Sequence, residues 1–341
     1  MIRFGIVGCG HIAAKHVEAI QNVQGAVLQA LCDSDAERMK PWAEDGIAAY
    51  LQYRDMLQDP CVDVVIICTP SGMHADMAIQ AAQAGKHVVV EKPLALTLLD
   101  AERVIAACSK HKVKLAVVHP NRYRPAIVQL KKMLDEGRFG KMSHASVKLR
   151  WNRNQDYYNQ SPWRGTRAMD GGVLMNQGIH SMDLLAWLMG PAVKVRAMSA
   201  TRLRNIEMED VALAVVQFAD GALGSVEVAS TVYPNNLEEE IALFGEHGSA
   251  VIGGPTAHWI KYWNFASLDK QEALAFVEHT HLNPFGEPGH THMIRDMVEA
   301  IRDDRDPHVS GEDGKRALQM VLDIYDASVN QRSSEEQLIS L

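Results

Sequence analysis

The chain has 341 residues, of which 47% are hydrophobic and 22% are charged, as in ordinary globular proteins. Its 42 acidic and 34 basic side chains give a formal net charge of −8, which argues against a nucleic-acid partner because such proteins usually carry a basic excess. No apolar stretch reaches the roughly 18 residues of a membrane span, and the first residues form a strand pattern rather than a signal peptide, so we expect a cytoplasmic protein with no membrane partner.

The first third of the chain alternates short apolar runs with helical patterns. Continuous apolar strands separated by helices are typical of a parallel sheet covered on both faces. Residues 1–122 are therefore predicted to form a doubly wound α/β domain of the Rossmann type. The expected strands are Ile2–Val7, Ala26–Cys32, Val62–Cys68, His87–Val90 and Leu115–His119, and the expected helices lie near Ile12–Val23, Met73–Ala84 and Leu98–His111.

The segment around the end of the first strand, GIVGCGHIA, carries Gly8, Gly10 and Ala13 in the spacing G-x-G-x-x-A. Glycines also mark ordinary turns, but this motif follows a strand and opens a helix, which is the context of a dinucleotide-binding loop. The first glycine allows a tight turn, and the second lets a pyrophosphate approach the backbone at the positive end of the helix. We therefore predict that Gly8, Gly10, His11 and Ile12 contact a dinucleotide.

An acidic residue is expected about 20 residues further on, at the end of the second strand. Asp33 stands there, directly after the sequence LQALC. A carboxylate at this point accepts hydrogen bonds from the 2′-hydroxyl of a ribose and repels a 2′-phosphate. The sequence therefore favours NAD over NADP as the cofactor, and Arg38 nearby is interpreted as part of a solvated helix face.

The loop after the third long strand, CTPSGMH, is expected at the same edge of the sheet. Ligands of open α/β sheets bind outside the carboxyl ends of the strands. Thr69, Ser71 and His74 are therefore predicted to line the cofactor site. The alternative is an ordinary strand–helix loop in which Thr69 or Ser71 caps the helix.

The next strand ends in two charges and a proline, Glu91-Lys92-Pro93. Charge at the end of a buried strand costs free energy unless it is paired or used. Glu91 and Lys92 are predicted to reach the cofactor, with the Lys92 ammonium as the partner of an alkoxide that forms on the substrate. A cationic nicotinamide nearby would lower the pKa of this lysine. The alternative is a surface lysine paired with Glu91.

Near Arg122 the pattern changes, and residues 123–341 are predicted to form a second, α+β domain. Successive strands with few helices between them are typical of a mostly antiparallel sheet. The expected strands are Lys141–Trp151, Val193–Arg202, Val211–Phe218, Leu223–Val232 and Glu240–Phe244, and the expected helices are Ala126–Glu136, Asp170–Gly190, Thr291–Arg302 and Glu312–Asn330.

The helix expected at Asp170–Gly190 is apolar on nearly all sides but keeps one polar line, made by Asn176, His180 and Asp183. A spacing of four residues places Asn176 and His180 on one face. A neutral imidazole suits proton transfer at physiological pH, so we predict His180 as a catalytic base with Asn176 beside it. The alternative is a core histidine that is satisfied by Asn176 or a backbone carbonyl.

A stretch of arginines and aromatic residues precedes this helix. Arginine forks suit phosphate and carboxylate groups, and aromatic faces suit a base or a sugar ring. In a protein of net charge −8, this stretch predicts a site for an anionic ligand, with a structural interface loop as the alternative. The candidate binding residues are Arg153, Tyr157, Trp163 and Arg164.

Four histidines form two H-x-H pairs late in the chain, at His279, His281, His290 and His292. Such pairs can bind metal, but no carboxylate or cysteine cluster completes a defined ligand geometry. We therefore expect no metal site and interpret the segment as a loop over a substrate pocket.

The ordered set of these motifs resembles the Gfo/Idh/MocA oxidoreductase family over essentially the whole chain. The resemblance implies an NAD(P)-dependent enzyme acting on sugar-type hydroxyls, in which a Rossmann domain is joined to an open, mostly antiparallel sheet that forms homodimers or homotetramers. The lysine of the family's E-K-P motif corresponds to Lys92, and its D-x-x-x-H pair corresponds to Asn176 and His180. Asparagine replaces the aspartate of many members, and it can orient His180 but cannot stabilise its cation as a carboxylate would.

Within the family, the segments NRYRPAI, SPWRGT and LMNQGIHSMDLLAWLMG are similar to those of enzymes that oxidise the 3-hydroxyl of UDP-N-acetylglucosamine-uronate. The similarity implies NAD as the cofactor, a nucleotide-sugar substrate, and Trp163 and Arg164 near the nicotinamide or the substrate. His180 or Lys92 would act as the base. A dehydrogenase of a simple sugar or an inositol-type polyol and an NAD-dependent glycosidase stay open as alternatives. The residues expected to contact the substrate are Lys92, Arg153, Tyr157, Asn176 and His180.

Overall fold

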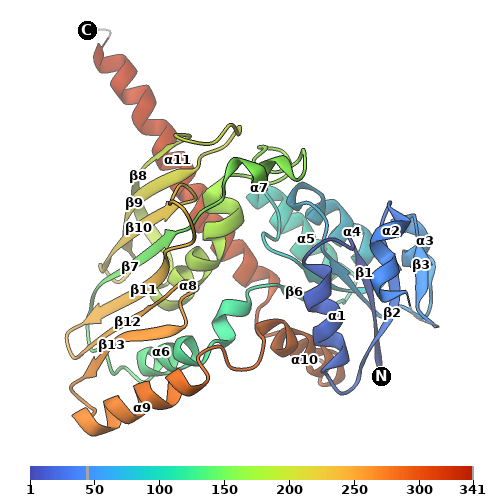
Figure 1. Cartoon of the computed structure of the whole chain (residues 1–341), viewed down its shortest axis with the longest axis horizontal. Helices are drawn as coiled ribbons and strands as arrows, with labels where there is room; N and C mark the ends of the chain where they lie inside the picture. Colours follow the sequence, from blue (N-terminus) through green and yellow to red (C-terminus); the bar gives the residue numbers. More distant parts are fainter. Residues whose placement is uncertain (44–45, 340–341) are drawn as a thin grey trace. The chain divides into compact units, whose positions relative to one another are not determined.

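The structure, a computed structural model, describes residues 1–43 and 46–339, with side chains placed up to residue 329. The chain forms two compact units, each built around a sheet of its own (Figure 1). No helix within these described ranges is both long and apolar enough to span a membrane.

The division into units differs in part from the expected one. Unit 1 comprises residues 1–120 and 287–315, and unit 2 comprises residues 121–286 and the chain from residue 316 onward. The boundary expected at residue 122 lies close to the first change of unit. Residues 287–315, however, return to unit 1, which a division into two continuous segments does not allow.

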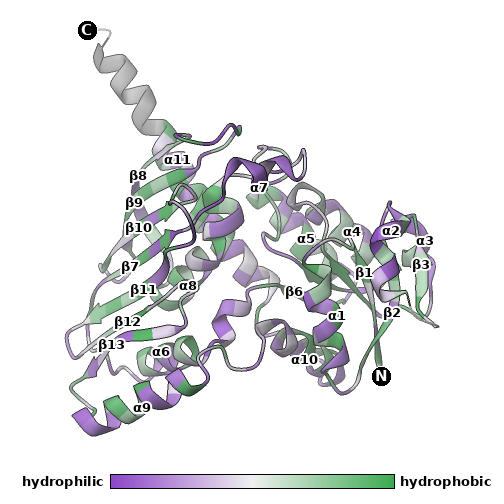
Figure 2. Ribbon diagram, in the orientation of Figure 1, coloured by the Kyte–Doolittle hydropathy of each residue, from purple (hydrophilic) through white to green (hydrophobic). Residues whose placement is uncertain are grey.

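Unit 1 contains a six-stranded sheet in which every pairing is parallel, which confirms the predicted doubly wound fold. The residues of β4 are all fully buried, as expected for a strand covered on both faces. In Figure 2, the neighbouring strand β1 is drawn mainly in green, the colour of hydrophobic residues. The strand order reverses between β1 and β4, which places the switch point of the fold beside the glycine motif. In the order β3-β2-β1-β4-β5-β6, the strands are Ala48–Tyr50, Ala26–Cys32, Ile2–Val7, Val64–Ile67, His87–Val90 and Leu115–Val117.

Helix α10, from the late part of the chain, packs against α1 of unit 1. Its buried residues Met293, Ile294 and Met297 recur at helical spacing and form one apolar face. This packing is why residues 287–315 belong to unit 1. The helical segments of the unit are α1 (Ala13–Gln21), α2 (Ala36–Met39), η1 (Lys40–Trp42), α3 (Tyr53–Gln58), η2 (Ser71–Met73), α4 (His74–Gln83), α5 (Leu98–Lys110) and α10 (Gly289–Arg302).

Unit 2 contains a seven-stranded sheet in which β7 and β10 pair in parallel and all other neighbours pair antiparallel, which confirms the mostly antiparallel prediction. Residues of β9 are buried and exposed in turn, so at this strand one face carries the core and the other carries accessible side chains, whereas β11 is buried on both faces. In the order β13-β12-β11-β7-β10-β9-β8, the strands are Trp259–Phe265, Gly248–Gly253, Glu238–Gly245, Met142–Arg150, Leu223–Ala229, Val211–Phe218 and Ala192–Ala200.

The single helix expected at Asp170–Gly190 is wrong in its first part. Residues 167–170 form a turn, Gly171 and Gly172 are irregular, η4 is a π-helical segment, and the regular α-helix α8 follows it. Gly171 adopts φ +81°, a left-handed conformation that ends any helix before it and favours glycine. Such π segments often occur at functional sites. The remaining helical segments are η3 (Pro120–Tyr123), α6 (Pro125–Asp135), α7 (Gln155–Asn159), η4 (Leu174–Gly178), α8 (Ile179–Met189), α9 (Lys270–Leu282) and α11 (Gly311–Ile339).

Candidate functional site

The carboxyl ends of the parallel strands bring the predicted cofactor residues of unit 1 to one edge of the sheet. Gly8 follows β1, Asp33 follows β2, Thr69 comes shortly after β4, and Glu91 follows β5. Strands β1 and β4 are neighbours at the switch point, where a doubly wound fold binds its ligand. The structure therefore groups these residues as the sequence predicts.

The glycine loop leaves room for a pyrophosphate. Gly8 has φ +88°, and a Cβ added to it would lie 2.7 Å from the carbonyl carbon of Cys68, so only glycine fits there. A Cβ added to Gly10 would meet nothing within 4 Å, so this backbone faces open space shortly before α1 begins. His11 is exposed and Ile12 is half-buried in the same loop. A cradle of this kind suits the phosphates of a dinucleotide.

Asp33 is buried and ties the end of β2 to the glycine loop. Its Oδ2 accepts the N–H of Cys9 at 2.8 Å, and its Oδ1 accepts the N–H of Asp35 at 2.9 Å. Each carboxylate oxygen can accept a second hydrogen bond, so the group can also receive a ribose hydroxyl. Its charge suits NAD better than a cofactor with a 2′-phosphate.

Thr69, Ser71 and His74 lie between β4 and α4. No side chain caps η2 or α4, so the alternative in which Thr69 or Ser71 caps a helix is wrong. His74 Nδ1 lies 2.7 Å from the carbonyl oxygen of Pro93, and Nε2 lies 2.9 Å from that of Thr69. Burial lowers the pKa of His74, and a neutral ring carries one N–H, so it donates to one carbonyl at a time. The ring ties two loops together, and its contact with the cofactor stays a prediction.

Glu91 is buried, and its carboxylate lies next to two histidines. His16 Nε2 on α1 is 2.9 Å from Oε1, and His290 Nε2 on α10 is 3.7 Å from the same oxygen. Burial alone would raise the pKa of Glu91, but the hydrogen bond from His16 and the nearness of His290 hold it well below its usual range. Its Oε2 accepts the backbone N–H of Lys92 at 3.2 Å. Glu91 is thus a buried anion whose two oxygens already face protein partners. This argues against a surface Lys92–Glu91 pair and against the predicted contact of Glu91 with the cofactor.

In unit 2, Asn176 lies in η4 beside a buried carboxylate. Its Nδ2 donates to Asp170, which also accepts the backbone N–H of Gly165 at 2.7 Å. Gln177 donates to the side-chain oxygen of Asn176 at 2.8 Å. His180 follows at the start of α8 and is half-buried. Asn176 thus stands where many members of the family that the sequence resembles carry aspartate, and its amide donates to a separate carboxylate, that of Asp170.

The predicted basic and aromatic residues of unit 2 form one cluster. The hydroxyl oxygen of Tyr157 accepts hydrogen bonds from Arg164 Nη1 at 2.6 Å and from Gln177 Nε2 at 3.1 Å. The Arg164 guanidinium lies over the rings of Tyr157 and Trp163, whereas Arg153 lies over Tyr157 and donates to Gln177. Neither arginine pairs with a carboxylate in the described part of the chain. Both guanidinium groups can therefore form ion pairs with an anionic ligand.

A second buried acid, Glu209, holds the start of η4. Its Oε1 accepts the N–H of Leu174 at 3.0 Å and the O–H of Tyr325 at 2.9 Å. Burial raises the pKa of Glu209 to about 7. Gly172 leaves the space that this carboxyl group needs, because a Cβ there would lie 1.9 Å from Oε2. Because Gly172 has no side chain, the Glu209 carboxyl group can accept the N–H of Leu174 at the first residue of η4.

The four late histidines do not lie on one loop, so that interpretation is wrong. His279 and His281 are on α9 in unit 2, and His290 and His292 are on α10 in unit 1. Only residues 283–288 between these helices are non-helical.

Several residues of these arrangements were not predicted, Glu209 and Tyr325 among them. Gln177 stands next to Asn176 as a polar side chain within an apolar segment, and Asp170 comes shortly before that segment. His16 lies on the buried face of α1, where a polar residue interrupts the apolar pattern. Such a signal indicates that a partner exists but not which residue it is.

Two family models match the chain. Residues 2–119 match an oxidoreductase family with an NAD-binding Rossmann fold, and residues 127–251 match the C-terminal domain of Gfo/Idh/MocA proteins. The chain belongs to the Gfo/Idh/MocA family. It is therefore an NAD-dependent oxidoreductase, as the glycine loop and Asp33 predict.

Relatives match over nearly their whole length. The WlbA dehydrogenase from Bordetella pertussis, solved in complex with NADH and UDP-GlcNAcA, is 36% identical, with 97% of each chain covered and a TM-score of 0.88. D-apiose dehydrogenase from Paraburkholderia graminis is 30% identical over 94% of this chain and 86% of its own. Myo-inositol 2-dehydrogenase from Thermotoga maritima is 27% identical over 93% of both.

Proposed function

We propose that the protein transfers a hydride between a sugar hydroxyl carbon and NAD, and that its substrate is a UDP-N-acetyl-hexosaminuronate that reacts at the 3-hydroxyl. The observation that carries the proposal is the likeness to the WlbA dehydrogenase, whose complex contains NADH and UDP-GlcNAcA. The cluster of Arg153, Tyr157 and Arg164 supports it, because an anionic nucleotide sugar needs cationic and aromatic partners.

Unit 1 would hold the cofactor. The glycine loop would receive the pyrophosphate, Asp33 the ribose, and Thr69 and Ser71 would line the site beside β4. When bound, the nicotinamide supplies the acceptor for the hydride. Lys92 would donate a hydrogen bond to the reacting substrate oxygen and stabilise the negative charge that develops there.

Unit 2 would supply the base. His180 would take the proton of the substrate hydroxyl. The hydride would leave the carbon that bears this hydroxyl, so that the alcohol becomes a carbonyl. Asn176, which donates a hydrogen bond to Asp170, would orient His180. The carboxylate of Asp170 would favour the imidazolium that forms on His180. Lys92 as the base, with His180 as the positioning group, is the alternative assignment. Trp163 would lie close to the nicotinamide or the substrate.

Turnover with UDP-N-acetylglucosamine-uronate, followed at the absorbance band of NADH, tests this proposal. Lys92→Ala and His180→Ala should each abolish turnover and leave NADH binding intact, because neither residue belongs to the glycine loop. Lys110→Ala and His247→Ala remove exposed side chains of the same two types and serve as controls. Near-normal turnover in both site variants would contradict the assignment.

A dehydrogenase of a simple sugar or inositol is the second candidate, and the similarity to myo-inositol 2-dehydrogenase favours it. Under this candidate UDP should not compete with the substrate, whereas under the main proposal UDP should be a competitive inhibitor. An NAD-dependent glycosidase would instead hydrolyse its sugar without net formation of NADH. A panel of UDP-sugars, uronates and polyols therefore separates the three reactions.

We also propose that the protein forms a homodimer or homotetramer through the sheet of unit 2. A row of cross-strand neighbours crosses the face of this sheet that carries Met198 and Leu213, which are 71% and 52% exposed, and it ends at the buried Glu240. Exposed apolar side chains in a continuous patch suit a protein partner. In the order β8-β9-β10-β7-β11, the row is Met198, Leu213, Glu227, Lys148 and Glu240.

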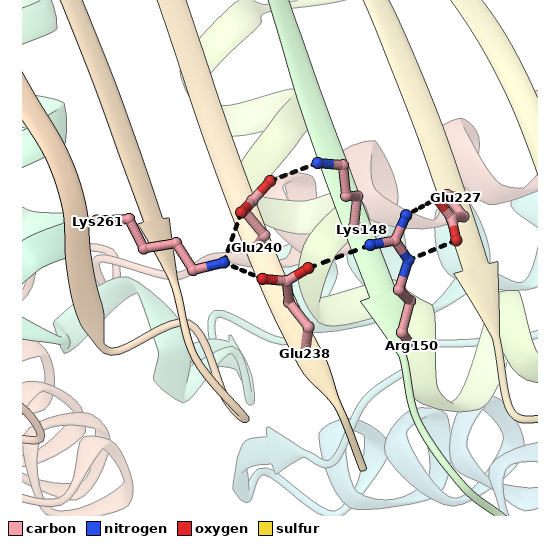
Figure 3. A network of polar contacts seen from close by, with 6 residues as sticks. All are labelled: Lys148, Arg150, Glu227, Glu238, Glu240 and Lys261. Atoms are coloured by element: carbon pink, nitrogen blue, oxygen red, sulfur yellow. Dashed lines mark hydrogen bonds and ion pairs between the residues drawn. The ribbon is translucent and has the colours of Figure 1, made fainter. Parts of the chain in front are cut away.

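The charged side chains on this face form ion pairs with one another, as Figure 3 shows. Three basic and three acidic side chains are joined by ion pairs, including a two-point contact of Arg150 with Glu227 at 2.6 and 2.7 Å. A charge-balanced face next to an apolar one can meet a copy of itself without repulsion. Leu213→Asp should shift the protein toward the monomer in light scattering, and a monomeric wild type at micromolar concentration would contradict the proposal.

We propose a cytoplasmic location for the protein. Its five cysteines are free thiols in the described chain, as expected in a reducing compartment. Fractionation of cells that express the native chain tests this location.

A further inference from the structure

Glu91 and its two histidines form a buried group to which the proposed chemistry gives no role. His16, Glu91 and His290 come from α1, the end of β5 and α10, and their possible ligand atoms all lie within 4.8 Å of one another. Their exposed fractions are 1%, 6% and 9%. A buried charge is costly unless it is paired or used, and this charge stands next to Lys92 in the sequence.

The group is a hydrogen-bonded His16–Glu91 pair with His290 beside it, rather than a metal site. His16 Nε2 lies 2.9 Å from Glu91 Oε1, the length of a hydrogen bond to a carboxylate. Two ligands on one tetrahedral zinc ion lie about 3.3 Å apart, because zinc–ligand distances are about 2.0–2.1 Å. A proton therefore fits between these two atoms better than a metal ion does.

The hydrogen-bonded pair of His16 and Glu91 carries one negative charge. Burial lowers the pKa of His16, whereas the pKa of Glu91 stays well below its usual range, so a neutral imidazole donates to an ionised carboxylate. His16 Nδ1 has no hydrogen-bond partner among the described residues, which fits a ring whose single N–H points at Glu91.

Two buried contacts hold the backbone on either side of the Lys92 side chain. Before it, Glu91 Oε2 accepts the backbone N–H of Lys92 at 3.2 Å. After it, the carbonyl oxygen of Pro93 lies 2.7 Å from His74 Nδ1. Both contacts come from groups that are nearly inaccessible to water, so the backbone that carries the Lys92 side chain has little freedom to shift.

From this arrangement we propose that Glu91 is a positioning residue, whose carboxylate, fixed by His16 and His290, holds the backbone of Lys92 so that its ammonium meets the substrate oxygen in one orientation. The inference rests on the proposed function of Lys92. Displacing a reacting group by about 1 Å can cost about 100-fold in rate. Removal of Glu91 should therefore slow the reaction without weakening cofactor binding, since Glu91 acts through Lys92.

The experiment compares Glu91→Ala, Glu91→Gln and Asp63→Asn in turnover of UDP-N-acetylglucosamine-uronate and in binding of NADH. Asp63 is the matched control, because it also accepts a backbone N–H and pairs with a basic side chain, Arg3, but precedes β4 at the opposite edge of the sheet. We expect Glu91→Ala to lower kcat about 100-fold with an unchanged Kd for NADH. Glu91→Gln should lose less, because its amide oxygen can still accept the Lys92 N–H.

A double variant tests whether Glu91 acts through Lys92. In single-turnover experiments with excess enzyme, which can measure a small residual rate, Lys92→Ala combined with Glu91→Ala should be no slower than Lys92→Ala alone, because a positioning residue has nothing left to position. Additive losses would overturn the inference, as would normal kcat in both Glu91 variants while Lys92→Ala is inactive. Normal turnover in Lys92→Ala would instead contradict the proposed function.

Hydrogen exchange followed by mass spectrometry gives a readout that needs no substrate. The Lys92 amide should exchange faster in Glu91→Ala than in the wild type and remain unchanged in Asp63→Asn. If Glu91→Ala does not fold, Glu91→Gln keeps the side-chain volume and is measured in the same way. Equal exchange in all forms, or one metal ion per chain that is lost in the Glu91 variants, would overturn the inference.

Discussion

Replacing Glu209 by glutamine should remove a pH-dependent loss of stability from unit 2. Glutamine keeps the shape of the side chain, and its amide oxygen can accept the same hydrogen bonds from Leu174 and Tyr325 that Oε1 accepts. What changes is the ability to ionise. The effect of the substitution therefore isolates the cost of a charge at this buried position.

The size of the effect follows from the pKa of Glu209, which burial raises from 4.5 to about 7. A shift of about 2.5 units corresponds to about 3.4 kcal/mol, at about 1.36 kcal/mol per unit. Because the folded state holds the proton more tightly, this stabilisation is complete below pH 4.5 and is lost as the pH rises through about 7. Between pH 5 and pH 8, the loss amounts to about 2.5 kcal/mol.

Urea unfolding of the wild type and of Glu209→Gln near pH 5 and near pH 8 measures this loss. Every tryptophan except Trp42 lies in unit 2, so the fluorescence reports on the unit that contains Glu209. The wild type should lose about 2.5 kcal/mol more than the variant between the two pH values. Parallel pH dependences in the two proteins would show that Glu209 is already ionised below neutral pH, and would refute the reasoning.

Three further changes have expected outcomes. Asp33→Ser should raise kcat/KM with NADP relative to NAD by about tenfold or more, because it removes the charge that repels a 2′-phosphate. Asn176→Asp should lower the melting temperature above neutral pH, because two carboxylates would share one site, and adding Asp170→Asn should restore it. Asp183→Ala should destabilise unit 2 by about 3–5 kcal/mol in urea unfolding, because it leaves the buried Arg122 guanidinium without its two-point partner at 2.6 and 2.8 Å; no loss would mean that this ion pair contributes little.

The sequence predicted unit 1 well because its strands are continuous apolar runs that alternate with amphipathic helices. Val64–Ile67 and His87–Val90 have this pattern, and the rule that ligands bind at the carboxyl ends of strands then placed Asp33 and Glu91 at one edge. The three residues of β3 were missed, since so short a strand shows no periodicity. The convergence of Lys92 and His180 on one substrate stays a prediction.

What the sequence could not provide is the identity of distant partners. Glu91 is 75 residues from His16 along the chain, and no local pattern joins the two. The contact of Asn176 with Asp170 depends on a turn at Gly171 and a π-helical segment, whereas uniform helical spacing would predict different neighbours. Periodicity predicts which side chains are buried, but the tertiary fold determines which residues they contact.

The return of residues 287–315 to unit 1 has a consequence for how the protein is made. A ribosome releases the first strands and the glycine loop early, yet the helix that covers α1 and brings His290 to Glu91 emerges only after all of residues 121–286. Unit 1 therefore cannot complete its fold until most of the chain has been translated. A fragment that stops at residue 122 would keep every residue of the glycine motif and still lack one wall of its own fold, whereas a shortened chain that joins residues 1–120 directly to 287–315 would contain the complete unit.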